Sequence, residues 1–239
     1  MKSSYLVPVL AECLVLLAAL SYAQPPAIEC PSTLDGIADC PITGCGADAD
    51  IELNKAKNKT DTPGESDIKH KTLDGMRAIA QPLRWNTGQD RASLRQQGKE
   101  GTPVVVEGFL SIVKPGSVES CNCGLTRRID TDVHLVLVDE IDDVEETSVT
   151  AELTPRIRAN GHSDWLYKNV KDLEGEYVRV TGWLMLDTKH IRQSQRQPGE
   201  HLNKALKRST NWEVHPVTKL EVCQKSMSAC KAGQGWAEF

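Results

Sequence analysis

The chain has 239 residues, of which 26% are charged and 39% hydrophobic, and its formal net charge is −5 with a sequence pI near 5.7. This acidic balance argues against a protein whose whole surface is built to bind nucleic acid. Without an N-terminal leader about 215 residues remain, which is enough for one sizeable core with extensions.

The first 23 residues are typical of a signal peptide. Lys2 supplies a basic start, an apolar run extends to Leu20, and Ser21-Tyr22-Ala23 places small residues where signal peptidase cleaves. A membrane anchor is the alternative, but the run is short for a bilayer and contains Pro8 and Glu12. We therefore expect an exported protein, periplasmic or secreted, with no transmembrane segment after cleavage.

Residues 24–101 form a polar, cysteine-containing extension, which we expect to pack partly on the domain that follows. Cys13 lies in the leader, and the cysteines that remain are Cys30, Cys40, Cys45, Cys121, Cys123, Cys223 and Cys230. Export favours disulfides, and Cys40–Cys45 and Cys223–Cys230 are the obvious local pairs. The odd number leaves at least one thiol free, metal-bound or intermolecular.

Residues 102–223 predict the order strand, strand, strand, helix, strand, strand, which is that of a five-stranded Greek-key barrel of the OB type. The expected strands, 103–114, 132–139, 148–154, 177–187 and 211–222, are rich in β-branched and alternating apolar residues. The helix is expected between a cap at Ser163 or Asp164 and Gly175. Pro216 requires an edge or a bulge in the last strand. A β-sandwich with one added helix is the alternative fold, and residues 224–239 form a C-terminal tail.

Polar side chains alternate with apolar ones on three strands that are neighbours in this fold. Asp132 and His134 lie on the second strand, Glu152 on the third and His215 on the last, all on the outward face of the barrel. Imidazole and carboxylate ligands suit zinc, iron or manganese. The pattern predicts a site for one divalent metal ion that activates water. Ordinary cross-strand pairs on a solvated face are the alternative.

Cys121-Asn122-Cys123 is a second constellation, because two thiolates so close can bind metal or exchange disulfides. The redox motif has two intervening residues, however, and no Cys-x-x-Cys is present for a closed zinc site. We favour the interpretation that each cysteine pairs with Cys30, Cys40 or Cys45. Such bonds would fasten the extension to the first loop of the barrel.

An OB barrel usually meets its ligand at the face of strands two and three and at two loops, here 115–131 and 188–210. Cationic and aromatic side chains gather in these loops and near them: Arg156, Arg179, Trp183, Lys189, Arg192, Arg196, Lys204, Lys207 and Arg208. Cations attract phosphates and aromatic rings stack bases, so the set predicts binding of single-stranded nucleic acid or another polyanion. The alternative is a solvated loop, with Trp183 covered by the extension.

The segments ESCNC, DTDVH, LTPRIR, VTGWLM and WEVHPVT all lie between Cys40 and Val222. In this combination the chain resembles a group of exported bacterial proteins, OB-fold-like and of unassigned activity. The resemblance implies an exported single-domain protein and no established chemistry.

The chain has no Gly-rich phosphate loop, nucleophile elbow or His-Glu-x-x-His motif, which excludes most common nucleotide enzymes, serine hydrolases and zinc proteases. Three functions remain. The first is a binding protein that captures a polyanionic or oligomeric ligand at the face of strands two, three and five and the two loops. The second is a metal-dependent hydrolase, such as a phosphodiesterase. The third is a structural envelope protein held together by its cysteines.

Overall fold

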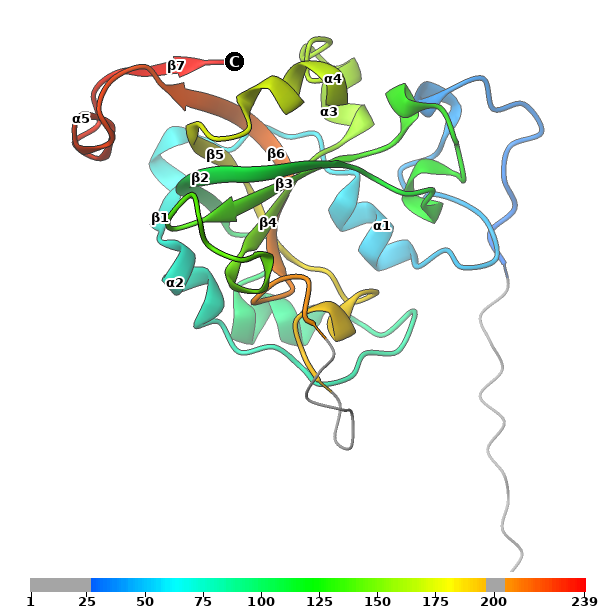
Figure 1. Cartoon of the computed structure of the whole chain (residues 1–239). Coiled ribbons are helices and arrows are strands. Elements are labelled where there is room, and N and C mark those ends of the chain that lie inside the picture. Colours follow the sequence, from blue (N-terminus) through cyan, green and yellow to red (C-terminus); the bar gives the residue numbers. More distant parts are fainter. Residues whose placement is uncertain (1–26, 197–204) are drawn as a thin grey trace, which may run out of the picture.

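The structure, a computed structural model, describes residues 27–196 and 205–239 (Figure 1). The predicted signal peptide and Lys204 lie outside the described residues. The strands are β1 (Lys69–Lys71), β2 (Pro103–Pro115), β3 (Val133–Val138), β4 (Val149–Leu153), β5 (Tyr177–Leu186), β6 (Trp212–Cys223) and β7 (Trp236–Glu238). The α-helices are α1 (Ile51–Lys57), α2 (Leu73–Arg77), α3 (Pro155–Ala159), α4 (Tyr167–Val170) and α5 (Met227–Lys231).

Strands β2, β3, β4, β6 and β5 close into a barrel in that order, because β5 pairs back onto β2. Neighbours are antiparallel except β4 and β6, which run parallel and share the register pair Ala151↔Val214. This is the strand order of an OB-like barrel, so the predicted fold is confirmed and the sandwich is excluded. Every end of the predicted barrel strands falls within one residue of the observed end. Strands β1 and β7, which were not predicted, pair with β2 and β6 at the outside of the barrel.

Pro216 lies at an irregularity in β6, as its missing N–H requires. The pairing of β6 with β5 shifts register on both sides of Gly182, and the His215–Pro216 peptide bond is cis. A Cβ on Gly182 would lie 2.2 Å from the carbonyl oxygen of Pro216, so glycine allows the two strands to approach here. Of the two arrangements predicted for Pro216, an edge or a bulge, the register shift matches the bulge.

The segment between β4 and β5 differs from the single helix expected there. Thr154 caps α3 by accepting from the backbone N–H of Ile157 at 3.3 Å, with Pro155 in the first turn. The second helix, α4, begins at Tyr167 instead of at Ser163 or Asp164. It continues as a 3-10 turn, and Gly175 ends the segment with a positive φ of 96°. The insertion is therefore two short helices.

The extension takes part in the core of the barrel. Leu73 and Met76 of α2 and Leu94 of a π-helical turn (Leu94–Gly98) join the apolar cluster that fills it. Trp212 of β6, fully buried, donates its indole N–H to the carbonyl of Ala80 at 3.0 Å. Within the described residues no helix is long and apolar enough to cross a bilayer.

The disulfides are Cys30–Cys45, Cys40–Cys123 and Cys223–Cys230, and Cys121 is a buried free thiol. The local pair Cys40–Cys45 predicted from the sequence is wrong, because Cys40 instead reaches across to the loop after β2. The pair Cys223–Cys230 is confirmed. Of the two cysteines in Cys121-Asn122-Cys123 one pairs with the extension, as expected, and the other stays free. Cys40–Cys123 thus fastens the extension to the barrel.

Candidate metal centre beneath the extension

Helix α1 lies beside the barrel (Figure 1). Its buried residues include polar side chains. Asp50 caps the helix with its carboxylate. Helical spacing then places Asn54, Lys57 and Asn58 on one side, and all three are buried. The side-chain amide of Asn58 donates to the carbonyl of Cys121 at 2.9 Å. The polar face of α1 is thereby attached to the loop that follows β2.

That loop forms a 3-10 turn at Ser120–Asn122 and approaches the extension closely. The backbone N–H of Cys45 donates to the carbonyl of Ser120 at 3.0 Å. Gly44 has a φ of +62°, and a Cβ there would lie 2.1 Å from the same oxygen. Only glycine fits this contact. With the Cys40–Cys123 disulfide it fixes the turn against the extension.

The turn carries polar groups toward the barrel. The thiol of Cys121 lies 3.3 Å from Oε2 of Glu119, and the ammonium of Lys57 pairs with the same carboxylate. The side-chain amide of Asn122 donates to Oδ1 of Asp132 at 3.2 Å. Glu119, Cys121 and Asp132 each offer a ligand atom, and these atoms lie within 4.8 Å of one another.

The sheet supplies the other half of the cluster. Strand register sets His134 opposite Glu152, with Nε2 of His134 3.4 Å from Oε1 of Glu152. The parallel pairing of β4 with β6 brings Nδ1 of His215 to 3.0 Å from Oε2 of Glu152. Asp132, Glu152 and His215 form a second group whose ligand atoms lie within 4.8 Å of one another. Three of the four predicted metal ligands therefore converge, and the fourth, His134, lies against Glu152.

These side chains do not lie on a solvated face. Asp132 is 2% exposed, Glu152 3% and His215 0%, because α1 and the Ser120–Asn122 turn cover them. The side chain of His134 is 28% exposed and is the member of the predicted set that solvent reaches. The strand pattern correctly predicts that these side chains point outward from the barrel. It does not predict that α1 and the Ser120–Asn122 turn bury them.

Asp132 is the carboxylate without a cationic partner. Burial raises its pKa to about 6, and the neighbouring carboxylates of Glu119 and Glu152 add to the shift. Asp132 makes no ion pair with any described residue, and its Oδ2 has no hydrogen-bond partner among them. Crowded, desolvated carboxylates of this kind favour a nearby positive charge.

Glu152 and His215 form the central pair. Burial opposes ionisation of Glu152, but His134 and His215 more than offset it and hold its pKa below the usual value. Burial also opposes protonation of His215, yet Glu152 and then Glu213 raise its pKa to about 10. Nδ1 of His215 lies 3.2 Å from Oε1 of Glu213, whereas Nε2 has no hydrogen-bond partner in the described part of the chain.

Arg208 connects the centre to the loop between β5 and β6. Its guanidinium pairs with Asp187 and, at 2.8 Å, with Glu213. Nδ1 of His190 lies 2.7 Å from the Asp187 carboxylate. Burial disfavours the charged form of Asp187, but Arg208 and His190 hold its pKa well below the usual value. Contacts thus run without a break from the base of this loop through Glu213 to His215.

Trp183, predicted to stack on a ligand, contacts the extension. Its indole N–H donates to the carbonyl of Asp61 at 2.9 Å, and Nζ of Lys59 lies 2.9 Å from the ring centroid. The alternative drawn from the sequence, that the extension covers Trp183, matches this placement.

The predicted ligand-binding cations divide into two groups. Arg156 donates to the carbonyl of Cys40 at 2.6 Å, Arg179 pairs with Glu221 at 2.7 Å, and Arg208 is buried. These three hold the fold together. The described members that are exposed all lie in the loop between β5 and β6, and they are Lys189, Arg192, Arg196 and Lys207.

The sequence analysis did not assign Lys57 or Glu119 to the site, and it treated Cys121 as part of a separate constellation that could bind metal or form a disulfide. The sequence does contain a signal for Lys57, because residues 54, 57 and 58 are polar and share one face of a short helix. Such a face contacts polar groups when it is buried. Glu119 stands two residues before a cysteine in a turn-forming segment. Neither pattern says which strands the segment will cover.

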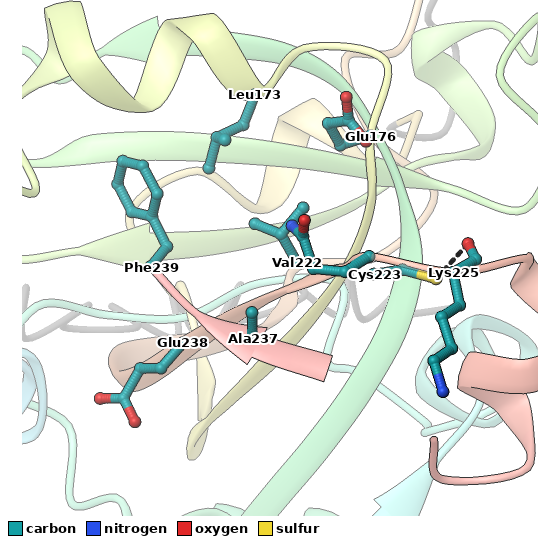
Figure 2. A pocket seen from close by; sticks show the side chains of 9 residues that line it. Leu173, Glu176, Val222, Cys223, Lys225, Ala237, Glu238 and Phe239 are labelled. Atoms are coloured by element: carbon teal, nitrogen blue, oxygen red, sulfur yellow. Dashed lines mark hydrogen bonds between the residues drawn. The ribbon is translucent and has the colours of Figure 1, made fainter. Parts of the chain in front are cut away.

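A pocket of about 400 Å³ lies elsewhere, between the end of β6 and β7 (Figure 2). Its lining includes Leu173, Val222 and Phe239, and none of its residues belongs to the polar cluster. The pocket is open, and among the described residues it brings together no group of metal-ligating side chains.

No family model matches the chain, and no curated protein matches it. Two solved structures with partial likeness are both asparaginyl-tRNA synthetase of Entamoeba histolytica. The complex with asparaginyl-adenylate is 17% identical with a TM-score of 0.29, over 53% of this chain and 22% of that one. The other is 12% identical with a TM-score of 0.32, over 72% of this chain and 26% of that one. This chain spans about a quarter of their length, and the fold assignment rests on its own strand pairing.

Proposed function

We propose that this chain is an exported, metal-dependent phosphodiesterase with its metal at Asp132, Glu152 and His215. One observation carries the proposal: ligand atoms of these three residues, from three different strands or strand ends, converge within 4.8 Å. In the same place Oδ2 of Asp132 and Nε2 of His215 lie buried without a hydrogen-bond partner among the described residues. Buried polar groups are normally satisfied, so two unsatisfied ones on members of one cluster support the proposal of a bound ligand.

The contacts of His215 support its role as a metal ligand. A histidine that binds metal through one ring nitrogen usually donates a hydrogen bond from the other to a carboxylate. Nδ1 of His215 lies 3.2 Å from the carboxylate of Glu213, which Arg208 holds in turn, and 3.0 Å from that of Glu152. One imidazole with two carboxylates suits zinc, manganese or iron.

A bound divalent ion supplies a Lewis acid and lowers the pKa of water in its coordination shell. Hydrolysis of a phosphodiester forms a bond from the water oxygen to phosphorus, breaks one P–O ester bond and releases an alcohol and a phosphomonoester. We assign the proton exchange to His134, because its side chain lies against Glu152 and is 28% exposed to solvent.

The substrate we propose is a polyanion such as single-stranded nucleic acid. The exposed cations of the loop between β5 and β6 would hold its phosphates, and Arg208 and Glu213 connect the base of that loop to the centre. Cations that bind phosphates make affinity fall steeply with salt. The disulfides and the predicted signal peptide support an oxidising compartment outside the cytoplasm.

The first test measures metal in the disulfide-bonded chain after dialysis against zinc or manganese. Elemental mass spectrometry should give at least one ion per chain when the Asp132–Glu152–His215 centre is filled. His215→Ala and Asp132→Asn should lose it, and His70→Ala, at an exposed position in β1, should keep it. Hydrolysis of bis(p-nitrophenyl) phosphate should follow metal content in all four proteins.

Metal retained by His215→Ala, or metal without hydrolysis, would overturn the phosphodiesterase. Salt-sensitive binding of single-stranded DNA that survives chelation, without turnover, would instead favour the binding protein. If the chain binds neither metal nor DNA, the structural envelope protein is the function that remains.

A further inference from the structure

Asp132 belongs to both groups of ligand atoms. One group joins it to Glu152 and His215, and the other joins it to Glu119 and Cys121. The first comes from the sheet and the second from the loop that follows β2. Asp132 lies where the two meet, with one oxygen facing Asn122 and the other without a partner in the described chain.

Asn122, which donates to Asp132 of the second group, carries another polar atom without a partner in the described part of the chain. Asn122 is 1% exposed, and its Oδ1 has no hydrogen-bond partner among the described residues although its Nδ2 donates to Asp132. Cys121 is 2% exposed and is the one cysteine of the described chain outside a disulfide. The Cys40–Cys123 bond removes both neighbouring sulfurs from competition, so Cys121 is the thiolate that this site can offer.

Charge points to the same place. Lys57 pairs with Glu119, and Arg208 pairs with Glu213. Each of these two carboxylates has its own cationic side chain. Asp132, shared by both groups, has none within the described residues.

We propose a second metal position formed by Glu119, Cys121 and Asp132, so that the Asp132 carboxylate bridges two divalent ions. This inference rests on the proposed function, because the first ion is the one held by Asp132, Glu152 and His215. The thiolate makes zinc the metal of choice for the second position. Cys121 must give up its thiol proton to solvent when the ion binds.

A bridged pair changes the chemistry that the site can perform. Two ions about 3.5–4 Å apart can stabilise the attacking and the leaving oxygen of a phosphodiester at once. A single ion serves one of these oxygens at a time. The second position therefore narrows the substrate class to phosphoryl esters cleaved by in-line attack of water.

Cobalt(II) titration of the disulfide-bonded, metal-free chain tests the inference, because thiolate ligation gives cobalt an ultraviolet charge-transfer band that oxygen and nitrogen ligands do not. We expect about two cobalt ions per chain, with the band present in the wild type. Cys121→Ser should lose the band and the second equivalent and keep the first. Ser117→Ala, at an exposed position of the same loop, should behave as wild type.

The outcomes separate the two proposals. About one ion without the band overturns the bridge and leaves the Asp132–Glu152–His215 site intact. An ion pair without the band also overturns it, because Cys121 is then no ligand. No bound cobalt overturns both proposals. Should Cys121→Ser fail to fold, X-ray absorption on the zinc-loaded wild type decides, since a thiolate ligand places sulfur about 2.3 Å from zinc and its absence contradicts the inference.

Discussion

Arg208 lies between two buried carboxylates, Asp187 and Glu213, and is itself 3% exposed. Removing one partner of a buried ion pair leaves charge without compensation, so Arg208→Ala should destabilise the fold by about 3–5 kcal/mol. Urea unfolding measures the loss. Arg95→Ala is the matched control, since Arg95 pairs with Asp90 in solvent and should cost no more than about 1 kcal/mol. An equal decrease in the free energy of unfolding in the two variants would show that the buried ion pairs of Arg208 stabilise the fold no more than an exposed pair does.

Residue patterns predicted that the candidate metal ligands share one face of the barrel, but not that another segment buries this face. Alternation along strands is enough to set Asp132, His134, Glu152 and His215 on one face, because side chains in a strand point to opposite sides in turn. Burial of that face depends on where a separate segment, α1, folds back. No local pattern encodes such a long-range contact.

Side-chain hydrogen bonds attach helix α1 and its C-terminal residue to neighbouring segments. Asn58 donates to the carbonyls of Ile42 and Cys121, both at 2.9 Å, and Asn58→Ala would remove this donor from both oxygens, of which that of Cys121 is in a buried contact. We expect a loss of about 1–3 kcal/mol in urea unfolding, with faster proteolysis of the extension. Lys55→Ala, on the exposed side of the same helix, should change the stability by less than about 0.5 kcal/mol. Unchanged proteolysis in Asn58→Ala would show that α1 is attached by other contacts.

Elements were predictable where their signals are local. The barrel strands agree closely because β-branched alternation spans each one. The helical insertion was misread because its first cap, Thr154 before Pro155, directly follows a strand and was counted as part of it. Very short helices such as α3 and α4 also carry too few residues to show a 3.6 period.

At the scale of the whole molecule, the disulfides differ in what they constrain. Cys40–Cys123 spans a sequence separation of 83 and Cys223–Cys230 one of 7. Replacing both cysteines of Cys40–Cys123 with serine should lower the free energy of unfolding by about 4–5 kcal/mol, because the bond closes a long loop in the unfolded chain. The same replacement at Cys223–Cys230 should lower it by about 2 kcal/mol. Urea unfolding under non-reducing conditions compares the two double variants. A larger loss for the short bridge would show that loop entropy does not govern these bonds.

The barrel strands differ in how far their main chains pair, and the parallel pair β4 and β6 has the shortest pairing. Main-chain pairing there is limited to Ala151↔Val214, whereas the other strands meet along long antiparallel ladders. Glu152 and His215, the residues next in each strand, join the two strands by side chains instead. The junction between β4 and β6 is therefore held largely by a charged side-chain contact, and a metal ion bound there would connect the two strands further. Metal occupancy would then determine how easily the barrel opens between β4 and β6.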